Sequence, residues 1–153
     1  MPSMKAMSVS DASDPLALDN QLCFALYSAS LAMTKAYKPL LDALDLTYPQ
    51  YLVMLVLWQH GSQSVSELGE RLFLDSGTLT PLLKRREAGD LLLRARSAQD
   101  ERRVQVSLTP AGRKLKARAA RFPGCMLSAS GCTLEELLAL TAQVRQLRAR
   151  LTA

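Results

Sequence analysis

The chain has few of the residues that build metal sites or disulfide frameworks. Its 153 residues include three cysteines and one histidine, His60, without a Cys-x-x-Cys pair. An odd number of cysteines at unmatched spacing argues against a disulfide scaffold, and a lone histidine argues against a zinc site. We therefore expect neither a metal nor a cofactor.

Long apolar runs are also missing. The longest, residues 51–58, is far too short to cross a bilayer, and the N-terminus lacks the apolar stretch of a signal peptide. We expect a cytoplasmic protein with no membrane contact, in a compartment where thiols stay reduced unless they act as sensors. The length and the 48% hydrophobic content fit one globular domain or one protomer of an oligomer.

The positive charge is confined to one part of the chain. Residues 84–121 carry 12 of the 19 lysines and arginines against four acids, whereas residues 1–83 carry four basic and eight acidic side chains. A basic segment inside an otherwise balanced chain is typical of a nucleic-acid footprint. A solvated charged surface is the alternative.

Cys23 is the most informative single residue. We expect residues 1–17 to be a disordered tail and a helix to run from Asn20, a good N-cap, to Tyr37, ending before Pro39. Cys23 then lies in the first helical turn, where unpaired N–H groups and the helix dipole favour a nucleophilic, oxidisable thiolate. The alternative is a small buried hydrophobe.

Two short helices joined by a tight turn are predicted after a longer, apolar helix. Thr47, Pro49 and Gln50 form the start signal of the apolar helix, which ends at Gly61. A capping box over 64–67 opens the first short helix, to about Leu72. Asp75 or Ser76 caps the second, over 77–88. This arrangement is typical of a helix-turn-helix.

A β-hairpin is predicted next. Residues 91–96 and the alternating residues Val104, Val106 and Leu108 flank a polar turn at 97–101. The hairpin would be the wing of a winged helix-turn-helix. Its arginines could reach phosphates or a minor groove; they are Arg94, Arg96, Arg102 and Arg103.

Helices are predicted for the rest of the chain. Thr109 and Pro110 start a basic helix through Arg121, which 123–124 should kink, and Thr133 caps a last helix with an apolar stripe. We expect 47–108 to form the winged core, and 18–46 and 109–153 to supply dimerisation helices; an intramolecular core is the alternative. The fold class is mainly α with a small β-hairpin wing.

The motifs resemble those of the MarR family of winged-helix repressors over roughly residues 20–150. The general match is Asp100-Glu101-Arg102-Arg103-Val104 followed by Ser107-Leu108-Thr109-Pro110-Ala111-Gly112. A narrower match, to the organic hydroperoxide resistance regulators, rests on the segments 20–27, 33–41, 47–51 and 74–85. Four motifs in the same order are far more specific than a generic helix-turn-helix.

The resemblance implies a homodimeric repressor of double-stranded operator DNA, released when organic hydroperoxide oxidises Cys23. In that group, tyrosines matching Tyr37 and Tyr48 contact the cysteine across the dimer interface, and Tyr27 is also present here. The resolving cysteine of some members matches Ser128, which lies between Cys125 and Cys132, either of which could take that role. Arg86 stands where the family usually has an apolar residue.

DNA contacts are expected from the second helix of the helix-turn-helix and from the wing. Arg85 is the best candidate for bidentate guanine contact, and Asp100 would orient an arginine. Two alternatives remain: a repressor released by a small phenolic ligand, and a thiol peroxidase, although we expect no enzyme. The expected DNA-binding residues are Ser76, Gly77, Thr78, Thr80, Pro81, Lys84, Arg85, Arg94, Asp100 and Arg102.

Overall fold

The protein is described from a computed structural model, which covers residues 12–153 apart from the side chain of Ala88. The described part of the chain divides into two compact units, the first ending at Ala36 and the second running from Tyr37 to Ala153. Most of the predicted disordered tail, residues 1–11, lies outside the described residues. Within 12–20 the chain is folded back locally, because the Asn20 side-chain amide donates to the Asp14 carbonyl at 2.8 Å.

Helix α2, Leu22–Asp42, departs from the predicted helix at both ends. It begins two residues after Asn20, which belongs to a 3-10 turn, Leu18–Asn20, and is not its cap. It also continues through Pro39, where we expected it to end. Pro39 cannot donate a backbone hydrogen bond, but Leu41 beyond it is 3% exposed, so packing in the core outweighs that loss.

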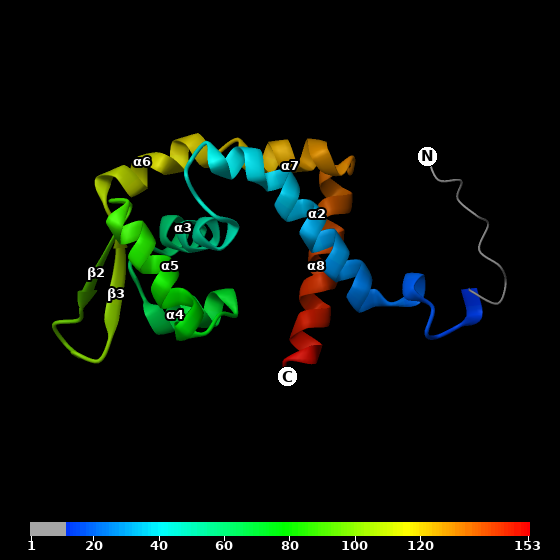
Figure 1. Cartoon of the computed structure of the whole chain (residues 1–153), viewed down its shortest axis with the longest axis horizontal. Coiled ribbons are helices and arrows are strands. Elements are labelled where there is room, and N and C mark those ends of the chain that lie inside the picture. Colours follow the sequence, from blue (N-terminus) through cyan, green and yellow to red (C-terminus); the bar gives the residue numbers. More distant parts are fainter. Residues whose placement is uncertain (1–11) are drawn as a thin grey trace. The chain divides into compact units, whose positions relative to one another are not determined.

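Helix α3, Tyr48–His60, begins and ends as predicted. The Thr47 side chain accepts from the Gln50 backbone N–H at 3.3 Å, and the Gln50 side chain accepts from the Thr47 N–H at 2.9 Å. Gly61 ends the helix with φ +75°, a left-handed value that favours glycine. The helix is buried on several sides and forms the centre of the second unit (Figure 1).

Helices α4, Val65–Leu72, and α5, Ser76–Ala88, form the predicted helix-turn-helix. Ser64 and Glu67 make the expected reciprocal capping box at the start of α4. Of the two candidate caps for α5, Asp75 is the one used: its carboxylate accepts from the Thr78 N–H at 2.7 Å. Both helices begin where side chains satisfy their free N–H groups.

The wing is a hairpin of β2, Leu92–Arg96, and β3, Val104–Leu108, and Figure 1 shows it projecting from the helices. A two-residue strand, β1, Gln63–Ser64, completes an antiparallel sheet of order β1-β3-β2. In the register, Leu92 faces Leu108 and Arg94 faces Val106. The prediction of a mainly α fold with a small β wing is confirmed.

One hydrophobic core joins the helix-turn-helix, the wing base and α6, Pro110–Ala119. Thr109 caps α6 as predicted, accepting from the Gly112 N–H at 3.0 Å. Gly112 lies so close to the Leu91 carbonyl that a side chain would not fit. The core extends beyond 47–108 in both directions, through Leu41, Leu44, Leu46, Leu115, Ala119 and Phe122.

The basic helix is shorter than predicted. It ends at Ala119, and α7, Phe122–Ser130, begins before Pro123, so the break precedes the expected kink. Helix α8, Leu134–Leu151, has the predicted cap: Thr133 accepts from the Glu136 N–H at 3.1 Å. No α8 residue is buried. In the described part of the chain, no helix is long and apolar enough to span a membrane.

Candidate nucleic-acid interface and cysteine site

Helix α5 has one buried face and one exposed polar face. Leu79 and Leu83 are fully buried, which directs the opposite face outward because residues three and four apart share a helix face. Thr80 is half-buried and the other predicted α5 contacts are exposed, so the structure brings this group together on one helix. These residues are Ser76, Gly77, Thr78, Thr80, Pro81, Lys84 and Arg85.

The four wing arginines differ in what they contact. The Arg94 side chain is 20% exposed, and its guanidinium lies 3.3 Å from Glu87 of α5. Arg103 pairs with Glu67 of α4 at 3.2 Å, and Arg96 donates to the Glu101 carbonyl at 2.7 Å. Arg94 and Arg103 therefore hold the wing against the helix-turn-helix. Because Glu87 holds Arg94, Arg94 is not among the residues proposed to contact DNA.

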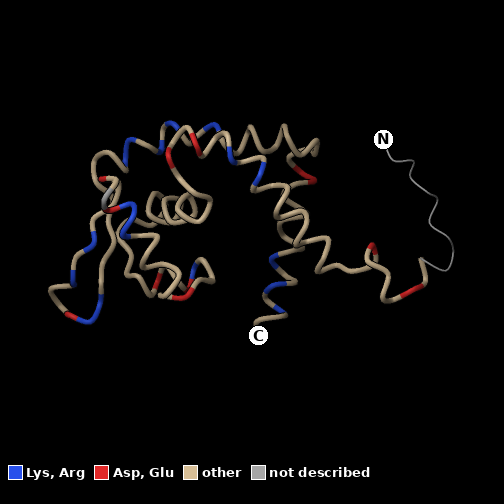
Figure 2. Tube along the Cα trace, viewed as in Figure 1, with Lys and Arg blue, Asp and Glu red and all other residues tan. Residues whose placement is uncertain are grey.

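Arg102 is the wing arginine that points into solvent. Its side chain is 96% exposed, and its nearest charged partner is Asp100, at 3.8 Å. Asp100 also accepts from the Arg102 backbone N–H at 3.0 Å. The expected pairing of Asp100 with an arginine is therefore present at the turn of the wing. Figure 2 shows basic residues along the wing, α5 and α6.

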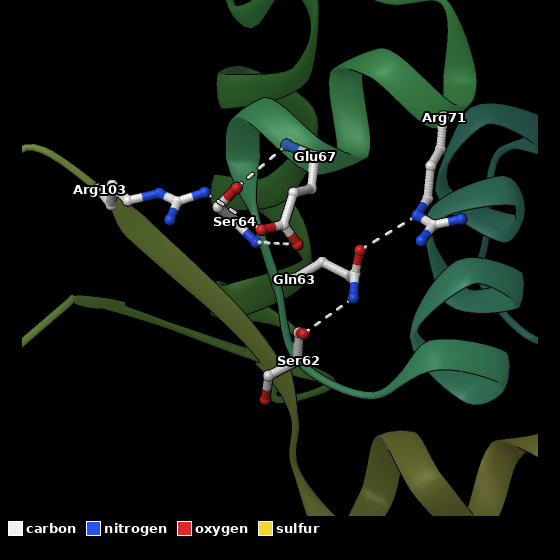
Figure 3. Close-up of polar contacts among 6 residues, drawn as sticks. All are labelled: Ser62, Gln63, Ser64, Glu67, Arg71 and Arg103. Atoms are coloured by element: carbon white, nitrogen blue, oxygen red, sulfur yellow. Dashed lines mark hydrogen bonds and ion pairs between the residues drawn. The ribbon is translucent and has the colours of Figure 1, made fainter.

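A polar network joins β1 and α4 to the wing (Figure 3). One Glu67 oxygen accepts from the Ser64 N–H at 3.4 Å, while the other meets Arg103. On the other side of this pair in Figure 3, away from Arg103, Arg71 donates to Gln63 at 3.1 Å. The helix cap of α4 is thus also the anchor of the wing, a role that the capping-box pattern alone did not reveal.

Two carboxylates at the ends of α5 have lowered pKa values. The Thr78 backbone N–H, which donates to Asp75, is the main cause of the lowered pKa of that carboxyl. At the other end, hydrogen bonds from the Arg94 side chain and then from its backbone N–H lower the pKa of Glu87. Both groups are therefore stabilised in their ionised forms, as caps and anchors require.

Three tyrosines form a cluster at the α2–α3 junction. The ring centroids of Tyr37 and Tyr48 are 5.3 Å apart, and Tyr51 lies 5.7 Å from Tyr37 and 6.3 Å from Tyr48. Burial raises the pKa of each phenol, that of Tyr51 to about 12. Tyr51 is a member that the sequence did not single out; its signal was its spacing of three from Tyr48.

The three cysteines are free thiols in the described residues. Cys23 is the second residue of α2 and is exposed; Tyr27, four residues later, is exposed on the same helix face. Cys125 in α7 and Cys132 after it are half-buried, and Ser128 between them is exposed. In residues 12–153, no group of three or more potential ligand side chains is placed to hold a metal.

A helix-turn-helix with an outward polar helix, followed by a wing anchored on it, defines a winged helix-turn-helix regulator of transcription. The family model of the transcriptional regulators SarA/Rot matches residues 35–119. The chain belongs to this MarR-like winged-helix family. The family resemblance inferred from the motifs is therefore confirmed.

Several characterised relatives are similar over most of their length. The organic hydroperoxide resistance transcriptional regulator of Bacillus subtilis is 54% identical over 81% of this chain and 84% of its own. The regulator TtmR of Methylorubrum extorquens is 49% identical over 99% of this chain and 78% of its own. The structure of reduced AbfR bound to DNA matches with 32% identity and a TM-score of 0.74, covering 89% of this chain and 95% of that one.

Proposed function

We propose that this regulator is a homodimeric repressor that binds double-stranded operator DNA and leaves it when organic hydroperoxide oxidises Cys23. The proposal rests chiefly on the exposed cysteine at the start of α2, in a chain whose helix α5 has an exposed polar face. Similarity to the organic hydroperoxide resistance regulator supports the choice of oxidant.

The DNA contacts come from two elements. The polar face of α5 enters the major groove as the recognition helix, and Arg85 donates two hydrogen bonds to a guanine. Arg102 contacts backbone phosphate or the minor groove from the wing, with Asp100 limiting its orientations. The similar protein AbfR is bound to DNA in its reduced form, which supports DNA binding by the present chain.

Dimerisation accounts for the exposed apolar side chains of α2 and α8. Leu31 in α2 and Leu138 in α8 are 56% and 59% exposed in the single chain. Exposed apolar side chains on two long helices are expected where a partner covers them. A symmetric dimer then presents two recognition helices to the two halves of a palindromic site. The other exposed large hydrophobic side chains of these two helices are Leu22, Phe24, Tyr27, Met33, Leu134, Leu140, Val144 and Leu151.

The oxidation step needs only the thiol and the peroxide. The Cys23 thiolate attacks the terminal peroxide oxygen, the O–O bond breaks, and the leaving alkoxide takes a proton to become an alcohol. Cys23 becomes a sulfenic acid. Tyrosines 37 and 48, whose raised pKa values keep them as O–H donors, stabilise the thiolate by hydrogen bonds in the assembled dimer. One oxidation per site is a switch and not enzymatic turnover.

Cys23→Ser tests the proposal. Serine is close in size to cysteine but cannot form a sulfenic acid, so the variant should bind operator DNA and stay bound after cumene hydroperoxide is added. A gel-shift titration on the promoter beside the protein's own gene measures both properties. Release of the Cys23→Ser protein from DNA by peroxide would mean that another residue is the sensor. Repeated consumption of peroxide by wild type with a thiol reductant would favour a peroxidase.

A further inference from the structure

Arg86 is a cation turned into the protein from the recognition helix. It follows Leu79 and Leu83 on the inner face of α5 and is only 9% exposed, whereas its neighbour Arg85 is exposed. Arginine is seldom buried to this extent unless it is paired. Its contacts must therefore contribute to how α5 is held.

The contacts of Arg86 lie on the loop between α2 and α3, residues 43–46. Its Nη1 donates to the Asp45 backbone carbonyl and lies 3.8 Å from the Asp45 carboxylate. That carboxylate is 98% exposed, so it neutralises the buried guanidinium only weakly. Asp45 has φ +54°, a left-handed value, and its backbone carbonyl accepts the hydrogen bond from Arg86 of α5.

The same loop is held from a second helix. Arg118 of α6 donates from Nη2 to the Ala43 carbonyl at 2.9 Å. Leu44 and Leu46 alternate with these carbonyls and are buried in the core. The loop also joins the two helices that carry the tyrosine cluster, with Tyr37 on one side and Tyr48 on the other.

We propose that Arg86 is a positioning residue that couples the loop 43–46 to the recognition helix, so that displacement of this loop moves α5 out of register with DNA. The proposal rests on the proposed function, because the displacing signal is the oxidation of Cys23 proposed above. A loop that shifted alone would leave the Arg86 guanidinium buried without an acceptor, which is costly. The loop and α5 therefore move together.

Arg86→Met tests this coupling, since methionine keeps much of the buried volume and removes the donors. For each variant, operator affinity is measured in the reduced protein and after organic hydroperoxide, and the ratio of the two affinities is the readout. We expect Arg86→Met to reduce that ratio roughly fivefold, within the range known for residues that carry coupling. Arg86→Lys keeps a hydrogen-bond donor, so its affinity ratio should lie between those of Arg86→Met and wild type.

Arg71→Met is the matched control, because Arg71 also joins two elements but does not contact the loop. Its ratio should equal that of wild type. A merely structural role of Arg86 would lower thermal stability and both affinities alike, leaving the ratio unchanged, and that result overturns the proposal. If wild type itself does not release DNA on oxidation, the proposed function is wrong, and the coupling proposal is wrong with it.

Hydrogen exchange in wild type provides a test that needs no variant. Leu46 donates its amide to Leu41, and Leu91 donates its amide to Arg86 at the end of α5. Oxidation should speed exchange of both amides together. Faster exchange at only one of the two amides would overturn the coupling. Because the test uses wild type, it remains decisive if Arg86→Met does not fold.

Discussion

The guanidinium of Arg94 lies 3.3 Å from the carboxylate of Glu87, which joins the first wing strand to the last turns of the recognition helix. The same carboxylate accepts from the Arg94 backbone N–H at 3.0 Å. With the pair of Arg103 and Glu67 on the other side, the wing is attached to both helices of the helix-turn-helix. The helix-turn-helix and the wing are therefore joined by two ion pairs, one to each helix.

Glu87→Gln should lower the melting temperature at neutral pH and lose this effect in acid. Arg94 lowers the pKa of Glu87 below its usual 4.5, so the ionised carboxylate stabilises the folded state above that pH. The stabilisation is lost as the pH falls below 4.5 and through the lower folded-state pKa. Melting curves of wild type and variant from pH 7 to 3 should converge. A constant difference across this range would mean that Glu87 acts only through its shape.

Arg102→Gln should weaken operator binding at low salt and reduce the slope of log affinity against log salt by about 1, as expected for one lost phosphate contact. Specificity between operator and random DNA should stay the same if the contact is to phosphate. Arg145→Gln, on α8 outside the proposed DNA interface, serves as the control. An unchanged slope for Arg102→Gln would remove this wing arginine from the DNA interface.

Arg85→Ala should relax the base preference at one position in each half-site. Loss of a bidentate guanine contact costs roughly 1–3 kcal/mol of discrimination. Competition binding with operators substituted at single positions measures the effect. Equal losses of affinity for operator and for random DNA would instead identify Arg85 as a phosphate contact.

Thr109→Val should lower the free energy of unfolding by roughly 2 kcal/mol. The hydroxyl of Thr109, a residue only 4% exposed, accepts from the Gly112 N–H and donates to the Asp90 carbonyl at 2.6 Å. Valine has nearly the same shape but leaves both groups unpaired. Urea unfolding measures the change. Thr109→Ser keeps the hydroxyl and should lose much less; a loss equal to that of valine would mean that the methyl group contributes as much as the hydroxyl.

Peroxide-treated wild type should form an intersubunit disulfide slowly and incompletely. The resemblance implies that Ser128 stands where some family members have a resolving thiol, so Cys125 or Cys132 must come within a Cα separation of roughly 4.4–6.8 Å of Cys23. Non-reducing gels of wild type, Cys125→Ser and Cys132→Ser identify the partner by the crosslink that is lost. Rapid, complete crosslinking in wild type would show that a native thiol resolves efficiently.

The sequence by itself determined the start of most helices and the type of fold. Local rules were sufficient there: capping residues such as Thr47 and Ser64 bond to N–H groups three residues away, and alternation over 104–108 sets strand periodicity. A third local rule, that a helix ends before proline, was wrong at Pro39, because burial of Leu41 against residues distant in sequence outweighs one missing hydrogen bond.

Only the tertiary structure decided which arginine side chains face solvent and which are held by other elements. Arg94 and Arg102 lie on the same hairpin, yet one is held by Glu87 and the other is solvated. Arg85 and Arg86 are adjacent, yet one faces solvent and the other faces the loop 43–46. The physical reason is that an arginine's partner is set by elements packed beside it, which composition and spacing do not encode.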